Sequence, residues 1–355
     1  MPYMSNMPQP KPEMLTGAIE SYLNYLANKG VGAVMDAGSF NNEEVIFKAV
    51  QKLEKAGKLP LRYEATHHVY MPSQLKTAVS KLLEYRKKYE GDLLKFNTIK
   101  IHFDGVNEIN TAAVLEDFAN EPGNKGGTIF NQKELKGLLL EAAKHKINLH
   151  LHTVGDRSVR IALNAYEKAQ KEYGKKLPVE LTLSHLEVVN PADMKRFKTL
   201  GVHANFTPHW VGGTVFKGSD VALGAKRYAH NQPINSLIKA GANVGFSSDV
   251  VSKPQEYRAN PFLGIQMGAT RQDPKLGKDT PVFGQKSDRA SVGNMIKGYT
   301  ISNAKAMGIE KQTGSIEVGK SADFMVLSKD LLKIDVYEIS KQSPLKVYFK
   351  GKVNK

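Results

Sequence analysis

The sequence predicts an α/β fold, a (β/α)8 barrel of the TIM type. Short apolar runs alternate strictly with amphipathic stretches between Gly30 and Asp249, which is the pattern of a parallel sheet covered by helices. A chain of 355 residues has room for a barrel of about 250 residues and a smaller appendage. Histidine and aspartate residues end several of the apolar runs, and barrels of this type carry their chemistry at that end of the strands.

The alternation assigns the elements in chain order. Residues 13–29 have helical periodicity, and Gly30 separates them from a short buried strand at 31–36. Six helix–strand pairs follow. The helices are predicted at 42–56, 74–90, 132–146, 156–172, 191–199 and 231–240, and the strands at 61–69, 97–104, 147–152, 179–185, 201–206 and 243–248. After an irregular segment at 253–288, a helix at 289–307 is expected to close the barrel.

Seven strands are one fewer than a closed barrel of this type needs. The stretch that follows His150 is too short to hold a whole barrel, so we interpret its strand as the fifth and expect the first strand to be missing. Residues 1–310 are thus predicted to form an incomplete barrel. Residues 311–355 contain β-like runs at 314–318, 322–327 and 345–350. Because three short strands cannot bury both faces alone, this segment is predicted to be part of a small β-sandwich.

Composition narrows the function classes. The net charge is +15, with 50 Lys and Arg against 35 Asp and Glu, but the lysines are scattered over predicted helix faces without a nucleic-acid motif, which is typical of a solvated surface. We expect a small-molecule substrate and no nucleic-acid partner. No apolar run is long enough to span a membrane, and no segment indicates a localisation. Because the chain has no cysteine, a metal must be bound by histidine, carboxylate or modified lysine.

Histidines at the ends of two predicted strands are candidate metal ligands. His150 and His152 are two residues apart on one strand, so their side chains point to the same side. His185 ends the next apolar run and Asp249 ends the last one. Imidazole and carboxylate groups gathered in this way are suited to Zn²⁺ or a similar cation.

Four motifs, in this order and spacing, resemble those of the amidohydrolase superfamily, family 3, in the branch that includes N-substituted formamide deformylase and the exoenzyme regulatory protein. The motifs are the stretch from His150 to Arg157, Leu183 to Glu187, Phe246 to Asp249 and Gly314 to Val326, with Lys100 to Gly105 upstream. The last of them also fits a phosphate-binding loop. A strand rather than a helix is predicted after it, however, so we interpret it as a turn.

The resemblance implies a site with one or two divalent metals, most often zinc. By position it implies metal ligands at Lys100, which is often carbamylated in the family, and at His152, His185 and Asp249. It assigns the catalytic proton transfer to Asp249. It also matches three positions with a role in substrate binding, namely His209, Arg227 and Arg271.

The sequence departs from the family at one point. The family's first-strand His-x-His has no counterpart, because His67 and His68 are adjacent and face opposite sides of a strand. One metal or none is therefore expected in this chain. His150 is interpreted as a packed or supporting residue. The remaining histidines are interpreted as structural, and they are His67, His68, His102, His145, His203 and His230.

These residues predict a metal-dependent amidohydrolase that cleaves the C–N bond of an amide or cyclic amide with metal-activated water. Two alternatives remain open. The same site is suited to esterase-type cleavage of a C–O bond. Alternatively, the chain is a truncated or split fragment that is inactive alone, in which case a homo-oligomer or an N-terminal segment supplies what is missing.

Overall fold

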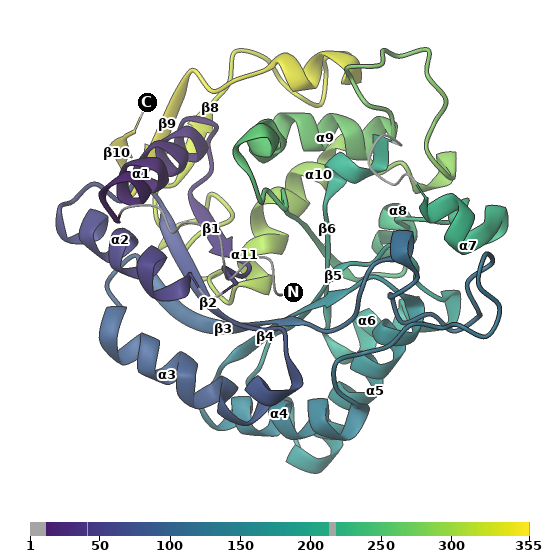
Figure 1. The fold of residues 1–355 in the computed structure, drawn as a ribbon. Coiled ribbons are helices and arrows are strands. Elements are labelled where there is room, and N and C mark those ends of the chain that lie inside the picture. The colour runs from purple at the N-terminus through teal and green to yellow at the C-terminus, as the bar shows by residue number, and fades with distance from the viewer. Residues whose placement is uncertain (1–11, 41, 213–217, 355) are drawn as a thin grey trace.

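The computed structural model describes residues 12–40, 42–212 and 218–354 (Figure 1). Seven parallel strands form one curled sheet in sequence order, with the helices on its outer side. All seven predicted strands are confirmed. They are β1 (Ala33–Asp36), β2 (Arg62–Val69), β3 (Leu94–His102), β4 (Asn148–Thr153), β5 (Leu181–His185), β6 (His203–Phe206) and β7 (Asn243–Phe246).

The helices follow the predicted alternation with three differences. They are α1 (Pro12–Asn28), α2 (Glu43–Lys55), α3 (Ala78–Tyr89), α4 (Gln132–Lys144), α5 (Asp156–Tyr173), α6 (Pro191–Leu200), α7 (Ser219–Tyr228), α8 (Ile234–Lys239), α9 (Pro261–Thr270), α10 (Val292–Lys297) and α11 (Asn303–Ala306). The helices α7 and α9 were not predicted, because each is short and lies in a segment rich in turn residues. The helix expected at 289–307 is divided, with a π-helical turn at Gly298–Ser302 between α10 and α11.

The strands carry apolar residues on one face and polar residues on the other. Leu149 and Leu151 of β4 belong to the same apolar cluster as helix residues such as Leu163 of α5, so this face is covered by the helices. The alternate residues therefore point to the concave side of the sheet. The strand register aligns them in a row that crosses six strands, formed by His68, Lys100, His150, Thr182, His203 and Asn243. The inner face of the half-barrel is thus polar.

The sheet does not close, because β1 and β7 do not pair among the described residues. Part of the free edge of β7 is satisfied by a side chain. Asn303 accepts a hydrogen bond from Phe246 N at 3.0 Å and donates one to Phe246 O at 2.7 Å. The carboxamide of Asn303 replaces one residue of a neighbouring strand and leaves the rest of the edge open.

The C-terminal segment forms a three-stranded antiparallel sheet in the order β10 (Lys352–Val353), β9 (Lys346–Phe349), β8 (Phe324–Val326). The prediction of a strand at 314–318 was wrong. This segment forms turns, which Gly314 at its start and Gly319 just after it favour. An ion pair of 2.6 Å between Arg62 and Asp323 ties this sheet to β2. Phe324 and Val326 remain partly exposed on it.

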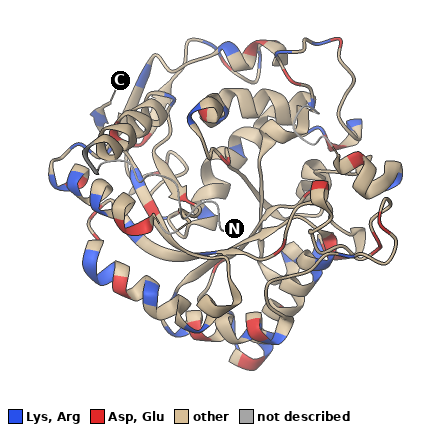
Figure 2. Ribbon diagram, viewed as in Figure 1, with Lys and Arg blue, Asp and Glu red and all other residues tan. Residues whose placement is uncertain are grey.

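Charged residues of both signs are distributed over the outer helices (Figure 2). In this view no helix carries an uninterrupted basic stripe. No helix in the described ranges combines the length and the apolar character that crossing a lipid bilayer requires.

Candidate functional site

Lys100 lies on the inner face of β3, near its carboxyl end, and is buried. Its Nζ donates a hydrogen bond of 3.4 Å to Ser184 Oγ, which itself donates to Leu151 O at 2.8 Å. Burial lowers the pKa of Lys100 to about 8, against the opposing charges of Asp249 and Asp104. About a tenth of this amine is therefore neutral and nucleophilic at pH 7, far more than for an ordinary lysine.

His152, two register positions along the same face, is held by Asp104. Asp104 Oδ1 lies 3.1 Å from His152 Nδ1, and the carboxylate is fully buried. As an anion, Asp104 accepts the Nδ1 proton, which leaves the Nε2 lone pair of His152 available to a metal. Asp104 is itself fixed by four further donors, which are Ala113 N, Val154 N, Gly155 N and Ser158 Oγ.

His185 reaches the site through a strained backbone. As the last residue of β5, its register partner is Thr153, so a regular strand would point it outward. Its φ is 77°, and that of Leu186 is 51°. Such left-handed conformations are uncommon outside glycine and gather at functional sites. The turn brings the imidazole ring of His185 to 4.4 Å from that of His152.

The environment of His185 keeps its imidazole neutral. Burial, followed by the charges of His152 and Lys100, holds the pKa of His185 well below its ordinary value. Its Nδ1 is buried and has no hydrogen-bond partner. Trp210, the only tryptophan of the chain, stacks on the ring at 5.1 Å with an interplanar angle of 11°. A neutral, sterically fixed imidazole is the form that binds divalent metals.

Asp249 follows β7 and also has a left-handed backbone, with φ of 45°. Its side chain is exposed, and its charge raises the pKa of Lys100. The structure thus brings Lys100, His152, His185 and Asp249 to the same end of the half-barrel.

Two histidines interpreted as structural also lie at this end. The ring of His102 stacks on that of His152 at 4.2 Å, and His68 lies 6.1 Å beyond His102. Burial lowers the pKa of His102 to about 3 and that of His68 to about 4. The signal for His102 was present in the sequence, because it is two residues after Lys100 and so shares its face. His150, expected as a supporting residue, is buried beside Lys100 in the register.

The donor set is suited to a divalent metal only if the lysine takes part. Among the described residues, no group of three His, Asp or Glu side chains is close enough to hold a metal ion. His152 and His185 supply two neutral nitrogens, and the orphaned Nδ1 of His185 is a buried atom that lacks a partner. The third donor would have to come from Lys100, whose amine coordinates a hard cation poorly until it is converted to a carbamate.

The three expected substrate-binding residues lie in different surroundings. His209 is buried, and both of its ring nitrogens lack partners. Arg227 donates to the carbonyls of Leu223, Glu116 and Asp117. Arg271 is fully buried and donates to the carbonyls of Asn231, Gln232 and Phe283. Because backbone carbonyls engage both guanidinium groups, we assign the two arginines to holding loops in place and do not carry them into the proposed site.

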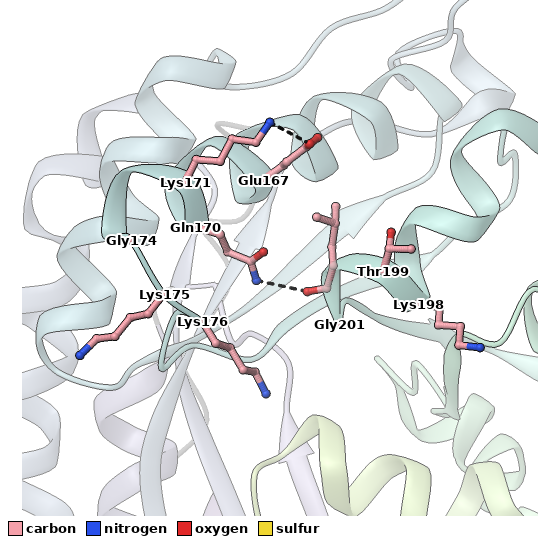
Figure 3. Close-up of a pocket in the computed structure, with 10 residues that line it drawn as sticks. Glu167, Gln170, Lys171, Gly174, Lys175, Lys176, Lys198, Thr199 and Gly201 are labelled. Carbon is pink, nitrogen blue, oxygen red and sulfur yellow. Dashed lines mark hydrogen bonds and ion pairs between the residues drawn. The ribbon is translucent and has the colours of Figure 1, made fainter.

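A cavity of about 710 Å³ lies elsewhere, between the C-terminal ends of α5 and α6 (Figure 3). It is therefore at the amino ends of the strands, away from Lys100. Its lysines point in different directions, and Lys171 pairs with Glu167 at 3.2 Å. The basic side chains do not converge on a common point, so we do not assign a ligand to this cavity.

Comparison with known proteins identifies the family of the chain. A sequence model of the family described as "Amidohydrolase family" matches residues 1–354. Protein YtcJ of Bacillus subtilis is 27% identical over 344 residues, which are 96% of this chain and 60% of that protein. The N-substituted formamide deformylase of Arthrobacter pascens is 23% identical over 311 residues, or 85% of this chain and 53% of that enzyme.

The fold is similar to that of solved structures. A crystal structure of an uncharacterized metal-dependent hydrolase from Pyrococcus furiosus superposes with a TM-score of 0.72 at 24% identity, covering 92% of this chain and 63% of that one. The chain thus spans less than two thirds of the length of each of these proteins.

Proposed function

Because the chain belongs to the amidohydrolase family, we propose that it is a metal-dependent hydrolase that cleaves the C–N bond of an amide or cyclic amide. The observation that carries this proposal is the convergence of His152 and His185 beside Lys100. One imidazole is oriented by a buried carboxylate, and the other is aimed by a strained backbone. Strain of this kind persists only where the surrounding structure enforces it.

In this proposal His152, His185, Lys100 and Asp249 hold one divalent ion, zinc by preference, with Lys100 as its carbamate. The lowered pKa of Lys100 supports this role, because carbon dioxide reacts with the neutral amine. The metal would supply Lewis-acid chemistry by polarising the scissile carbonyl and lowering the pKa of water. The proposed substrate is a small molecule.

Asp249 acts as the proton carrier. Its exposed carboxylate, on a left-handed residue beside the charge of Lys100, is free to reach a substrate. It takes a proton from the attacking water and delivers it to the departing nitrogen, so that an amine leaves and Asp249 is again ionised.

The open sheet bears on whether the chain acts alone. The unpaired edges of β1 and β7 support a proposal that a further strand, from another segment or a second copy, completes the barrel and adds donors to the metal site. In the same way, the partly exposed face of the β8–β10 sheet supports a small β-sandwich with additional strands. Esterase-type cleavage uses the same residues, and a matched pair of amide and ester substrates distinguishes the two activities by kcat/KM.

The test is metal analysis of the whole chain together with a screen for amide hydrolysis. Bound zinc and measurable turnover are expected in the wild type. Asp249→Asn is expected to lower kcat by at least about 100-fold, the lower range for general acid–base catalysis. Ser252, which lies nearby in the same loop and has no assigned role, provides the matched control as Ser252→Ala. Unchanged turnover in the Asp249 variant would reject the role of its carboxylate.

A further inference from the structure

A cluster of buried polar side chains lies beside the proposed metal site and takes no part in it. Asn107 follows β3 three residues after Asp104, and Glu187 follows β5 two residues after His185. Gln232 lies in the link between α7 and α8. Loops at the carboxyl ends of barrel strands are where substrates are recognised, and these three residues lie in the segments that follow β3, β5 and β6.

Two hydrogen bonds join the three residues. Asn107 Nδ2 donates to Glu187 Oε2 at 2.8 Å, and Gln232 N donates to Glu187 O at 2.9 Å. Exposure is 2% for Glu187 and 0% for both Asn107 and Gln232. Asn107 is therefore joined to Glu187 through side chains, Gln232 is joined to Glu187 through the backbone, and all three side chains are enclosed.

Much of its hydrogen-bonding capacity is unused. Within the described ranges, Asn107 Oδ1, Gln232 Nε2 and Gln232 Oε1 have no hydrogen-bond partner, and the same holds for the side-chain oxygen and nitrogen of the neighbouring Asn231. Asn107 Oδ1 belongs to the amide that donates to Glu187, so it lies beside that carboxyl group. Each unsatisfied buried polar group is costly, and native proteins contain few of them. Such a concentration points to a missing ligand.

The backbone that carries these groups is braced. Gln232 has a left-handed backbone with φ of 57°. Arg271 donates to Asn231 O and Gln232 O, both at 2.8 Å, and to Phe283 O at 2.6 Å. A fully buried arginine thus holds the strained turn in place. This arrangement maintains a costly conformation at the edge of a site, which is characteristic of ligand-binding positions.

We propose that Asn107, Glu187 and Gln232 form a substrate-recognition subsite for a neutral group that both donates and accepts hydrogen bonds, such as a carboxamide. An anion is disfavoured, because Glu108 and Asp104 lie close enough to act on Glu187 and the nearby Arg271 is engaged by carbonyls. A cation would leave the amide donors of Asn231 and Gln232 unpaired. The subsite rests on the proposed hydrolase function, since it would position the substrate of that reaction.

The test measures binding of acetamide to the whole chain after removal of metal, by titration with saturation-transfer NMR. Saturable acetamide binding is expected in the wild type. Gln232→Met and Asn107→Leu each remove a hydrogen-bonding group of similar size, and each is expected to weaken the binding by about fivefold or more. Gln170→Met is the matched control, because Gln170 donates to Leu200 O at the opposite end of the barrel. It should bind acetamide as the wild type does.

Thermal unfolding separates loss of binding from loss of fold. Since Gln232→Met removes two unpaired buried atoms, its Tm should equal or exceed that of the wild type. The proposal would be overturned by absence of saturable acetamide binding in the wild type, by wild-type affinity for acetamide in both subsite variants, or by tighter binding of methylammonium or acetate. Acetamide binding to a chain that never takes up metal would count against the hydrolase function and leave the subsite standing. Metal uptake without acetamide binding would count against the subsite and leave the hydrolase function standing.

Discussion

Replacing Asp104 by asparagine should impair metal binding by changing the tautomer of His152. Asp104 Oδ2 accepts hydrogen bonds from three backbone N–H groups and from Ser158 Oγ, whereas Oδ1 faces His152 Nδ1 and Val154 N. The carboxamide has only one acceptor oxygen, which belongs at the Oδ2 position, where most donors converge. Its NH2 group then faces His152 and donates to Nδ1. The imidazole proton moves to Nε2, the atom that should bind the metal.

The expected magnitudes follow from these contacts. Loss of a supporting partner of this kind lowers metal affinity by about 10- to 100-fold. The fold also loses part of a buried, charged hydrogen-bond network, at about 2 kcal/mol. For a chain of this size, that corresponds to a decrease in Tm of about 3 °C. Metal affinity and fold stability should therefore both decrease in Asp104→Asn, and the decrease in metal affinity should be larger than the loss of stability alone explains.

The assay is a Zn²⁺ titration of the metal-free chain, followed by the fluorescence of Trp210. This tryptophan is the only one in the chain and stacks on His185, so its signal reports on the site without a label. Ser158→Ala is the control, because it removes one donor to Asp104 without altering the proton on His152. It should cost about 1 kcal/mol of stability and leave the zinc affinity unchanged. Equal zinc affinity in wild type and Asp104→Asn would refute the tautomer argument.

Three further outcomes are expected. His185→Ala should abolish zinc binding and change Tm little, since the imidazole has an unpaired buried nitrogen; equal metal content in variant and wild type would contradict its assignment. Glu64→Gln should become more stable relative to wild type as pH rises. Burial raises the pKa of Glu64 to about 7 from 4.5, so the folded wild type holds a proton that the unfolded chain has lost. Its stability therefore decreases between about pH 4.5 and 7, by about 3 kcal/mol. Urea unfolding at pH 5, 6, 7 and 8 measures this, and parallel curves for the two proteins would show that Glu64 is not the cause. Finally, the open edges of β1 and β7 should make the chain self-associate or unfold readily; a concentration-independent monomer in sedimentation, with cooperative unfolding, would be inconsistent with exposed edges.

The sheet was predictable from the sequence because its signal is local. Alternating faces within each strand, and glycines between elements, were sufficient to identify all seven strands. The short helices α7 and α9 were not identified, since neither has enough turns to establish a period. The division of the helix at 289–307 arises from tertiary packing against β7, where Gly298 meets the ring of Phe246. No local pattern encodes that contact.

The candidate site was predictable in part. His152 and His185 were identified from their positions after strands, and they lie together in the fold. Asp104 and Trp210 were not given a role, because a supporting contact depends on which loops meet in space. From the sequence, Arg271 was interpreted as a surface or substrate-binding residue. Its burial among backbone carbonyls depends on the folded structure, which brings those carbonyls together.

The separation of faces in the half-barrel divides its residues into two classes with different freedom to vary. Outward positions such as Leu149 and Leu151 contribute to the apolar packing with the helices, so their replacement costs stability directly. Inward positions such as Thr182 and Asn243 contribute little to that packing. Their replacement removes polar contacts, such as the 2.9 Å hydrogen bond from Asn243 Nδ2 to Ser302 O, so the substrate-facing side chains can change while the apolar packing with the helices is kept.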